Sequence, residues 1–365
     1  MSTTSPTPDH AGHWIVTAFG DPSVLRWQTF DPPPPVNDQA LLRILVAGIS
    51  GVDNMMRTGE YPHPLTAKPG FVPGQECVGR IEAIGPEVSG LRVGELVVSF
   101  CFLGAYATHV LISANDVVPI QETDDPVKIV ALPLNYMTAY GLLTRSVGKI
   151  EPGSTVLVGS VSGGIGTAIA QVATTFNMGL VPYGTCSPSK FDYVKSLGVT
   201  PIDRFTDDLA SEVKKLTDGK GVDVAFDAVG TEDSIRASVA ATKSDVGQVV
   251  VYGWLDAVAA KKGKDMPETG SNTYATLDAF IKSGAVPRTK FWAFAWDYYS
   301  VKEEYFRDLN RIIEAVRNGG LNPVVGKLFR LSDAVLANSY LVSGAGVRGK
   351  MEFIVDAELA KRHNI

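Results

Sequence analysis

The stretch from Val156 to Gln171, VLVGSVSGGIGTAIAQ, constrains the fold of this chain more than any other. An apolar run stops at a cluster of small residues, and a run of good helix formers follows. Small residues after a buried strand let the backbone turn tightly and approach a ligand, and the next helix presents free N–H groups and its positive end to an anion. The stretch is therefore either a phosphate cradle or a glycine-rich turn between a strand and a helix.

The neighbourhood of this stretch favours the cradle. Ser160, Gly163 and Gly166 fall where a dinucleotide-binding fingerprint places its three small residues. The pattern follows an apolar strand and opens a helix in the first unit of a strand–helix series, which is the context that the fingerprint requires. We therefore predict that the turn binds a cofactor through Ser162, Gly163, Gly164, Ile165 and Gly166.

The rhythm of the chain predicts an α/β fold in two parts. From Trp14 to about Ala114, short apolar runs separated by Gly and Pro indicate a mostly β unit with a barrel-like or strongly curved sheet. Strands then alternate with helical patterns of 10–15 residues, which indicates a parallel sheet. The expected strands are 155–160, 180–184, 222–230 and 247–253, before a last strand at 350–356, and the expected helices are 166–176, 189–198, 208–219, 303–320 and 332–344. Ser189 and Ser332 are the predicted N-caps of the helices that they begin.

Composition narrows the class of protein. The 365 residues suffice for two domains, and the net charge of −6 without Lys/Arg runs argues against nucleic-acid and anionic-membrane partners. No apolar run approaches the roughly 18 residues of a membrane span. The polar start (residues 1–12) has no signal-peptide pattern and is predicted to be a disordered tail, and we expect a cytoplasmic location. The three cysteines form no CxxC pair, so neither a disulfide framework nor a cysteine-rich zinc lobe is expected: Cys77, Cys101 and Cys186.

The end of the second strand bears on the choice of cofactor. An NAD site would place Asp or Glu about 20 residues after the glycine turn, to hold the ribose 2′-hydroxyl. The sequence there is YGTCSPSK (183–190), which has no acid but offers Thr185, Ser187 and the cation of Lys190. These groups suit a 2′-phosphate, so we predict NADPH as the cofactor, with Arg204 assisting. The alternative is that Lys190 is an exposed helix residue.

With these motifs in place, the sequence resembles a family, the medium-chain dehydrogenase/reductases, in particular the zinc-free quinone oxidoreductase and enoyl reductase branch. The resemblance runs from about Leu41 to Val355 and rests on five pieces: VAGISGVDNMMRTGEYP, PGFVPGQECVGRIEAIGPEVSGLRVGELV, LNYMTAYGLL, VSGGIGTAIAQ and VDVAFDAVG. It implies a GroES-like catalytic domain at 1–131, a Rossmann NADPH-binding domain at 132–296, and a segment at 297–365 that returns to the catalytic domain.

The departures from the family pattern concern the metal. Zinc alcohol dehydrogenases of this superfamily place a metal-binding Cys where Ser50 stands, and His-Glu where Gln75 and Glu76 stand. Serine and glutamine are poor zinc ligands, so no metal site is expected. Without a Lewis acid, an activated alkene is a better substrate than an alcohol or a simple carbonyl. The resemblance thus implies hydride transfer to the C=C bond of an enone, a quinone or an enoyl thioester.

The resemblance also carries individual residues. Tyr61 matches a tyrosine proposed as proton donor in enoyl reductases; the alternative is a loop tyrosine that caps the cleft. Ser50 replaces an Asn common in the branch and is the second catalytic candidate. Thr138 matches a threonine near the nicotinamide, against the alternative of a hydroxyl bonded back to its own helix. The remaining cofactor candidates follow two strand ends: Gly230, Gly253 and Trp254.

Two questions stay open in the sequence. Residues 256–289 look longer than in simple quinone reductases, and KFWAFAWDYY (290–299) is either a buried or interfacial strand or an aromatic wall for a long or flat substrate. The leading function is a small-molecule reductase. Its alternatives are an enoyl reductase that acts in trans in a biosynthetic pathway and a non-catalytic NADPH-binding protein. The branch contains homodimers as well as monomers.

Overall fold

The computed structural model describes residues 10–148, 150–254, 273–343 and 347–365. The described chain divides into two compact units. Unit 1 contains residues 10–134 and 325–365, and unit 2 contains residues 135–254 and 273–324, apart from the positions just excluded. Most of the predicted 1–12 tail lies outside the described residues, and Gly12 begins a strand.

Unit 1 is mostly β, as the short apolar runs predicted, and all its strand pairs except β14–β15 are antiparallel. A hairpin pairs β1 (Gly12–Val16) with β2 (Leu25–Thr29), and a seven-stranded sheet has the order β14-β15-β3-β4-β5-β7, with β6 paired to β3. The long strand β3 is almost wholly buried, because it has neighbours on both sides. The strands of this sheet are β3 (Gln39–Ile49), β4 (Glu76–Ile84), β5 (Leu96–Phe100), β6 (His109–Ser113), β7 (Val117–Pro119), β14 (Val325–Arg330) and β15 (Lys350–Ile354).

Short helices complete unit 1, and three of them begin at a Ser or Asp N-cap. Ser50 begins α1 (Gly51–Arg57), Asp125 begins α2 (Pro126–Ile129) and Asp356 begins α12 (Ala357–Arg362), each with a side-chain hydrogen bond to the first turn. Helix α11 (Ala334–Ser343) follows a 3-10 turn at Leu331–Asp333, so Ser332 lies within that turn and does not cap the helix as the sequence suggested.

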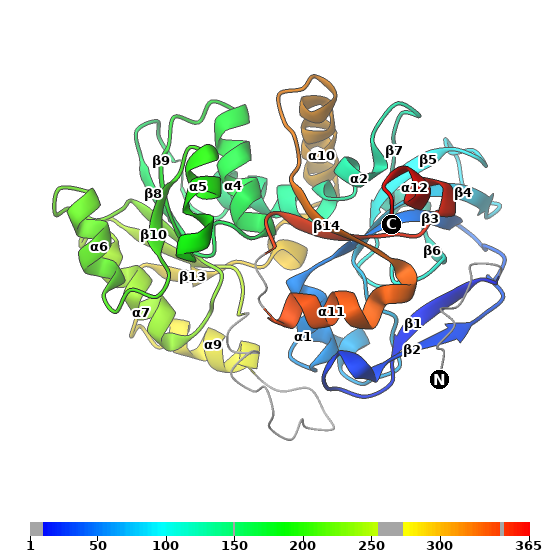
Figure 1. The fold of residues 1–365 in the computed structure, drawn as a ribbon, viewed down its shortest axis with the longest axis horizontal. Coiled ribbons are helices and arrows are strands. Elements are labelled where there is room, and N and C mark those ends of the chain that lie inside the picture. Colours follow the sequence, from blue (N-terminus) through cyan, green and yellow to red (C-terminus); the bar gives the residue numbers. More distant parts are fainter. Residues whose placement is uncertain (1–9, 149, 255–272, 344–346) are drawn as a thin grey trace. The chain divides into compact units, whose positions relative to one another are not determined.

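Unit 2 has a parallel sheet, of which Figure 1 labels β8, β9, β10 and β13. Its six strands have the order β10-β9-β8-β11-β12-β13. This is the doubly wound order, in which the first strand along the chain lies in the middle and the connection reverses direction beside it, between β8 and β11. Ligands of such sheets bind outside the carboxyl ends of the strands at that reversal. The strands are β8 (Thr155–Val158), β9 (Val181–Cys186), β10 (Thr200–Asp203), β11 (Val224–Asp227), β12 (Gln248–Val251) and β13 (Thr289–Phe291).

The helices of unit 2 alternate with these strands. They are α3 (Met137–Thr144), α4 (Gly164–Thr175), α5 (Phe191–Ser196), α6 (Leu209–Leu216), α7 (Glu232–Ala241), α9 (Thr273–Lys282) and α10 (Lys302–Arg317). A 3-10 turn at Pro188–Lys190 precedes α5, so Ser189 lies inside the turn and is not the helix cap that we expected. The aromatic stretch 290–299 is not one strand, because β13 ends at Phe291 and a π-helical turn, Ala295–Tyr299, follows.

Two further features concern the whole chain. Residues 297–324, which the sequence assigned to the returning segment, belong to unit 2, because α10 packs against α3 of the parallel-sheet unit.

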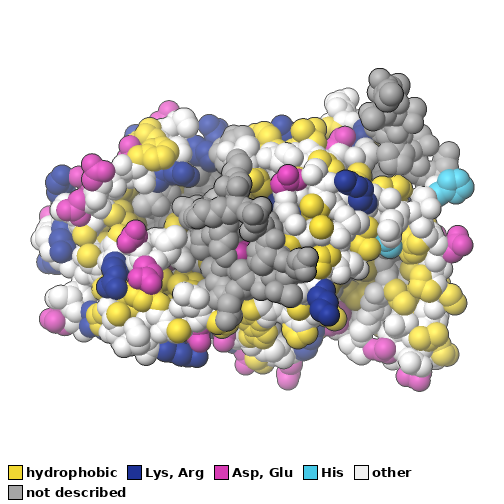
Figure 2. Space-filling view, turned by 90° about the horizontal axis from the view of Figure 1, so that it is seen from below, with side chains coloured by type: hydrophobic (Ala, Val, Ile, Leu, Met, Phe, Trp, Pro, Cys, Tyr) yellow, Lys and Arg dark blue, Asp and Glu magenta, His cyan; other side chains and the backbone are white. Residues whose placement is uncertain are grey.

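No helix among the described residues is long and apolar enough to cross a membrane. On the face in Figure 2, Lys and Arg side chains are interspersed with Asp and Glu, which is consistent with the absence of charge runs in the sequence.

Candidate functional site

The loop after β8 has the conformation that its small residues allow. The backbone of Ser160 has a φ of 57°, in the left-handed region. The loop is held to both neighbouring strands: Gly159 N–H donates to the Phe226 carbonyl at 2.9 Å, and Ser160 N–H donates to the hydroxyl oxygen of Thr185 at 3.1 Å. These bonds hold the turn at the carboxyl ends of β8, β9 and β11, where the fold reverses.

Glycine is required where this loop approaches the next helix and strand. A Cβ at Gly166 would lie 2.5 Å from the Val161 Cα and 2.7 Å from the Ser160 carbonyl oxygen. A Cβ at Gly184 on β9 would lie 2.5 Å from the Val161 Cβ. Both contacts involve backbone or branched atoms that cannot move aside cheaply. The close packing of strand, loop and helix therefore depends on missing side chains.

Helix α4 begins in this loop without a side-chain cap. Its N-cap is Gly163, which has no side chain to accept a hydrogen bond from the first turn. The first N–H groups of the helix and its positive end are thus available to an anionic ligand. Four predicted cofactor residues lie at this turn or in the first turn of the helix, and the fifth, Ser162, is buried beside them.

The cationic candidates lie at the carboxyl ends of the next two strands. Ser187 follows β9 and begins the 3-10 turn that ends at Lys190, and the Lys190 ammonium lowers the pKa of the neighbouring Cys186 thiol against the larger opposite effect of burial. Arg204 follows β10, and its N–H donates to the Cys186 carbonyl at 3.0 Å. The Arg204 guanidinium lies 4.8 Å from the centre of the exposed Phe205 ring. This corner of the sheet therefore carries two cations.

The loops after β11 and β12 meet through their backbones. Gly230 has a φ of 68°, and a Cβ there would lie 2.2 Å from the Gly253 carbonyl oxygen and 2.6 Å from the Trp254 Cα. The Asp227 carboxylate accepts hydrogen bonds from the N–H groups of Val229 (2.8 Å) and Gly230 (3.1 Å), which shapes the first loop. The three predicted residues of these loops thus lie side by side at one edge of the sheet.

Thr138 carries a buried polar atom that the protein does not use. Its side chain is 3% exposed, and its hydroxyl has no hydrogen-bond partner among the described residues. The expected alternative, a hydroxyl bonded back to its own helix, is therefore wrong for Thr138, although Thr144 of the same helix donates to the Tyr140 carbonyl at 2.6 Å. A buried hydroxyl without a partner costs free energy, so it is a candidate contact for a ligand.

Tyr61 lies in unit 1, shortly after α1, and is buried. Its side chain is hydrogen-bonded to Gln75, and its ring centre lies 6.0 Å from that of Phe102. Burial raises the pKa of the Tyr61 phenol strongly, and the bond from Gln75 lowers that pKa by less. Tyr61 is therefore a neutral phenol at any ordinary pH, which suits a hydrogen-bond donor more than a strong acid.

The second catalytic candidate, Ser50, has a structural task. It is the N-cap of α1 in a capping box, where its N–H donates to the Asp53 carboxylate at 2.7 Å and its hydroxyl donates to the same oxygen at 3.0 Å. The hydroxyl proton is thus engaged within the helix cap. The pattern Ser-x-x-Asp in the sequence is the ordinary signature of such a cap.

Sequence reasoning missed a buried charge cluster in unit 1. Lys350 and Glu76 form an ion pair, and both side chains are at most 2% exposed. The other Glu76 oxygen accepts the N–H of Leu134 at 2.9 Å, at the residue where unit 1 ends. Glu352 is 0% exposed, and its carboxyl oxygens have no hydrogen-bond partner among the described residues. Burial raises the pKa of Glu352 well above its usual range, so this carboxyl is held neutral.

The position of Gln75 was weighed in the sequence only as a replaced metal ligand. The structure gives it another contact, the hydroxyl of Tyr61, and leaves its buried amide oxygen without a hydrogen-bond partner among the described residues. Within those residues, no group of three or more His, Cys, Asp or Glu side chains is arranged to hold a metal ion. The residues at the metal-binding positions of the family pattern are thus a capping serine, an amide and the carboxylate of Glu76, which pairs with Lys350.

The predicted residues therefore fall into two groups. Unit 2 brings together the cofactor candidates at the carboxyl ends of its strands, with Thr138 on the helix that packs against α4. Unit 1 holds Tyr61 and Ser50, whose environments differ as described. The sequence singled out the aromatic stretch 290–299 but not its ring contacts with Trp254 and Tyr274, which lie on separate segments: Trp254 with Tyr274 and Phe291, and Tyr274 with Trp296.

Comparison with known proteins identifies the two units. Residues 36–122 match the alcohol dehydrogenase GroES-like domain, and residues 164–274 match the zinc-binding dehydrogenase family. The chain is 31% identical to a 2-haloacrylate reductase of a Burkholderia species, over 90% of this chain and 94% of the relative. It is 27% identical to the synaptic vesicle membrane protein VAT-1 homolog of Danio rerio over 87% of this chain, and spans 64% of that relative's length.

Solved structures of similar fold cover nearly the whole chain. A Pseudomonas syringae quinone oxidoreductase superposes with a TM-score of 0.74 at 25% identity, covering 94% of this chain and 100% of the other. A mycobacterial protein complexed with NADPH has a TM-score of 0.77 at 25% identity, with the same coverage of 94% and 100%. The predicted fold class, a GroES-like unit with a Rossmann unit, is thereby confirmed. The chain belongs to the medium-chain dehydrogenase/reductase superfamily, in the branch of the quinone oxidoreductases and enoyl reductases.

Proposed function

We propose that this protein is an NADPH-dependent reductase of activated C=C bonds in enones, quinones or enoyl thioesters, and that it works without a metal. The observation that carries the proposal is the uncapped, glycine-lined start of α4 at the carboxyl edge of the parallel sheet. That geometry fits a pyrophosphate, because it offers backbone N–H groups and excludes side chains. A relative of similar fold has been solved with NADPH, which supports the same cofactor here.

The choice of NADPH over NADH rests on the ends of β9 and β10. Residues 183–190 contain no carboxylate to hold a ribose 2′-hydroxyl, whereas Lys190 and Arg204 flank the same corner. A 2′-phosphate would be held there by charge-assisted hydrogen bonds, which are the strong ones. Replacement Lys190→Ala should raise the KM for NADPH about tenfold and leave that for NADH unchanged.

The chain's own groups account for the rest of the reaction. A bound NADPH would supply the hydride for the carbon β to a carbonyl, and a proton taken up from water at the α carbon would complete the saturated product. The pKa of Tyr61, raised by burial, keeps its phenol protonated, and we propose that it donates a hydrogen bond to the carbonyl oxygen as negative charge develops there. Gln75, hydrogen-bonded to Tyr61, orients that phenol. Thr138 offers its unpartnered hydroxyl to the cofactor.

The donor chemistry supports a reaction without zinc. The residue at the family's cysteine position, Ser50, uses its hydroxyl to cap α1, and the residue at the histidine position, Gln75, has an amide. Neither is a thiolate, an imidazole or a carboxylate, which are the ligands that zinc prefers. An acceptor that is already activated by conjugation needs only hydrogen bonds at its oxygen.

Deuterium transfer tests the proposal directly. Purified protein is incubated with NADPH deuterated at nicotinamide C4 (both C4-deuterated epimers in turn) and with an enone, and the product is analysed by NMR. The expected product is the saturated ketone with deuterium on the β carbon, formed from one of the two epimers. Deuterium on the carbonyl carbon, as an alcohol, would contradict the proposed reaction, and cofactor binding without any transfer would favour a non-catalytic role.

A further inference from the structure

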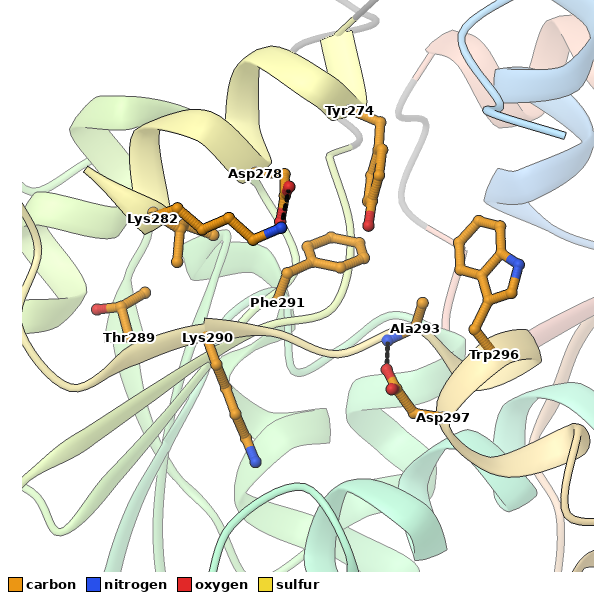
Figure 3. A pocket seen from close by; sticks show the side chains of 10 residues that line it. Tyr274, Asp278, Lys282, Thr289, Lys290, Phe291, Ala293, Trp296 and Asp297 are labelled. Atoms are coloured by element: carbon orange, nitrogen blue, oxygen red, sulfur yellow. Dashed lines mark hydrogen bonds and ion pairs between the residues drawn. The ribbon is translucent and has the colours of Figure 1, made fainter. Parts of the chain in front are cut away.

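A groove in unit 2 runs between helix α9 and strand β13 (Figure 3). It has a volume of about 360 Å³, which lies in the range of small-molecule sites. Figure 3 shows rings at one end, from Tyr274, Phe291 and Trp296, and polar side chains at the other, from Lys282 and Thr289. The cofactor-binding and hydrogen-bonding roles proposed above leave this groove unused.

The aromatic end is a connected set of rings. The Tyr274 ring centre lies 5.0 Å from that of Phe291, at an interplanar angle of 77°, and 5.9 Å from that of Trp296. These separations are typical of favourable aromatic pairs. Trp296 is nevertheless 42% exposed, on the π-helical turn that follows β13. A large indole kept partly in solvent at the rim of a groove offers a surface on which another flat ring can stack.

The ring set reaches the candidate cofactor residues. Trp254 lies 5.6 Å from Phe291 and 5.9 Å from Tyr274, measured between ring centres. The Trp254 backbone in turn packs against Gly230, where an added Cβ would lie 2.6 Å from its Cα. The groove is therefore one tryptophan away from the loops after β11 and β12, at the carboxyl end of the sheet, where ligands of this fold bind.

The charges around the groove balance. The Lys282 ammonium is paired with the Asp278 carboxylate at 2.6 Å, and the Asp297 carboxylate accepts the N–H of Ala293 at 2.6 Å. Burial and Asp278 raise the pKa of the Tyr274 phenol, so this ring is neutral. The lining also contains Lys290, so two lysines and two aspartates leave the groove without net charge. An uncharged ring is the ligand that suits it.

We propose that the groove is a binding site for the uncharged aryl ring of the acceptor, and that it makes the enzyme prefer aryl-conjugated enones to compact ones. This inference rests on the proposed function, since it names the class of acceptor. In the reduction of 4-phenyl-3-buten-2-one, the hydride forms a C–H bond at the carbon that bears the phenyl group, the C=C π bond is lost, and a proton adds at the α carbon. The products are 4-phenylbutan-2-one and NADP⁺.

Two matched substrates and three variants test the site. The enones are 4-phenyl-3-buten-2-one and 3-penten-2-one, which differ only by phenyl against methyl. The variants are Trp296→Ala, Trp296→Phe and, as control, Val246→Ala, since Val246 is 64% exposed in the same unit and precedes the opposite, amino end of β12. The readouts are kcat/KM for each enone with NADPH, and binding of 4-phenylbutan-2-one by calorimetry.

We expect the phenyl-to-methyl ratio of kcat/KM to fall about three- to tenfold in Trp296→Ala, to be largely kept in Trp296→Phe, and to be unchanged in the control. Equal ratios in the wild type and Trp296→Ala, with both enones turned over, would overturn the site. Absence of turnover for both enones would instead contradict the proposed function. Calorimetry then tests the groove by itself: binding of 4-phenylbutan-2-one that is lost only in Trp296→Ala supports the aryl site, and no binding to the wild type overturns it. A change of Trp296→Ala from dimer to monomer with an unchanged ratio would mean that a second copy occupies the groove, which also overturns the proposal.

Discussion

The two units organise their interiors in opposite ways. Unit 2 does so by leaving side chains out: Gly166 and Gly230 stand where backbone approaches backbone, Gly184 makes room for the Val161 side chain, and the start of α4 has no side-chain cap. Unit 1 instead buries ionisable groups: Lys350 forms an ion pair with Glu76, and the neutral carboxyl of Glu352 is buried in the same sheet. The two strategies meet at Gly48, where an added Cβ would lie 2.3 Å from a Glu76 carboxylate oxygen. An absent side chain lets segments of the chain pack closely, whereas a buried charge requires a partner.

The difference teaches where each unit is vulnerable. A turn packed around glycines is destabilised by an added side-chain atom, but its stability depends little on any one polar neighbour. A buried charge cluster tolerates a change of size but not the loss of one partner, because the remaining charge is then buried alone. Substitutions in the charge cluster of unit 1 and at the glycine turn of unit 2 therefore test the two arrangements independently. Their expected effects on stability and on affinity for NADPH decrease from the charge cluster to a single hydroxyl.

The largest effect is expected for Lys350→Met. This change leaves the buried Glu76 carboxylate without its cation, which should cost about 3–5 kcal/mol of unfolding free energy, measured by urea denaturation. The added change Glu76→Gln should recover part of that loss. Lys361→Met is the control, because Lys361 pairs with Glu358 on the surface and should cost about 0–1 kcal/mol. Equal losses for Lys350→Met and Lys361→Met would contradict a stabilising role of the charge cluster.

The next effect is expected for Gly166→Ala. The new Cβ would lie 2.5 Å from the Val161 Cα, so strand, loop and helix must separate, at a cost of about 1–3 kcal/mol. The affinity for NADPH should also fall at least about tenfold in calorimetry, because the loop moves away from the helix start. The control is Gly148→Ala, where no atom lies within 4 Å of the added Cβ. An unchanged affinity for NADPH in Gly166→Ala would show that the turn does not cradle the cofactor.

The third effect concerns pH. Burial raises the pKa of Glu352 in the folded protein, while Lys350 opposes that shift and Glu76 and Asp125 add to it. The folded state therefore keeps a proton that the unfolded state has already lost, so stability is fully present below the unfolded pKa and falls as pH rises toward the folded one. One such proton gives a slope of about −1.4 kcal/mol per pH unit.

Glu352→Gln removes that proton from the balance. The unfolding free energy should then fall less steeply above about pH 4.5, by up to the slope that one proton contributes. Burial also raises the pKa values of Glu76 and Asp53, and their contributions to the slope remain. Denaturation series from pH 4.5 upward, run in parallel on both proteins, measure the two slopes. Identical slopes would mean that Glu352 is ionised in the folded protein.

The smallest effect is expected for Thr138→Val, which should change stability and cofactor affinity in opposite directions. Thr138→Val removes a buried hydroxyl that has no partner among the described residues, so the protein without cofactor should gain about 1 kcal/mol in stability while its affinity for NADPH falls about fivefold. Thr144→Val, on the same helix, is the control, since its hydroxyl already donates to the Tyr140 carbonyl and its removal should bring no gain. A loss of stability in Thr138→Val, or an unchanged affinity, would place the hydroxyl in the protein's own packing.

The sequence predicted best what is local. The strand, glycine turn and helix at residues 155–176 depend on neighbours in the chain, and the structure has them with small shifts of the ends. The two misplaced caps, Ser189 and Ser332, fail because a 3-10 turn precedes each helix and moves its start past the serine. Ser50 carries a local signal, Ser-x-x-Asp, that indicates a cap, and its suggested catalytic role came from resemblance alone.

What the sequence could not show depends on strands far apart in the chain. Lys350 meets Glu76 because β15 and β4 both pair with β3, and no periodicity in either strand indicates that register. Gln75 and Tyr61 meet in the same unit through a loop whose course the sequence does not predict. The aromatic groove likewise needs the pairing of β12 with β13 to bring Trp254 close to Phe291. The roles of the site residues stay predictions that the variants above test.

The measurement that tests the central claim most directly is the initial rate of NADPH and of NADH oxidation by the purified protein, over a panel of enones, quinones and enoyl thioesters. We expect turnover of the conjugated alkenes with NADPH, a KM for NADH at least about tenfold higher, and no loss of rate after treatment with a metal chelator. Equal use of both nicotinamides would contradict the assignment of Lys190 and Arg204. Tight binding of NADPH with no turnover of any acceptor would contradict the reductase itself.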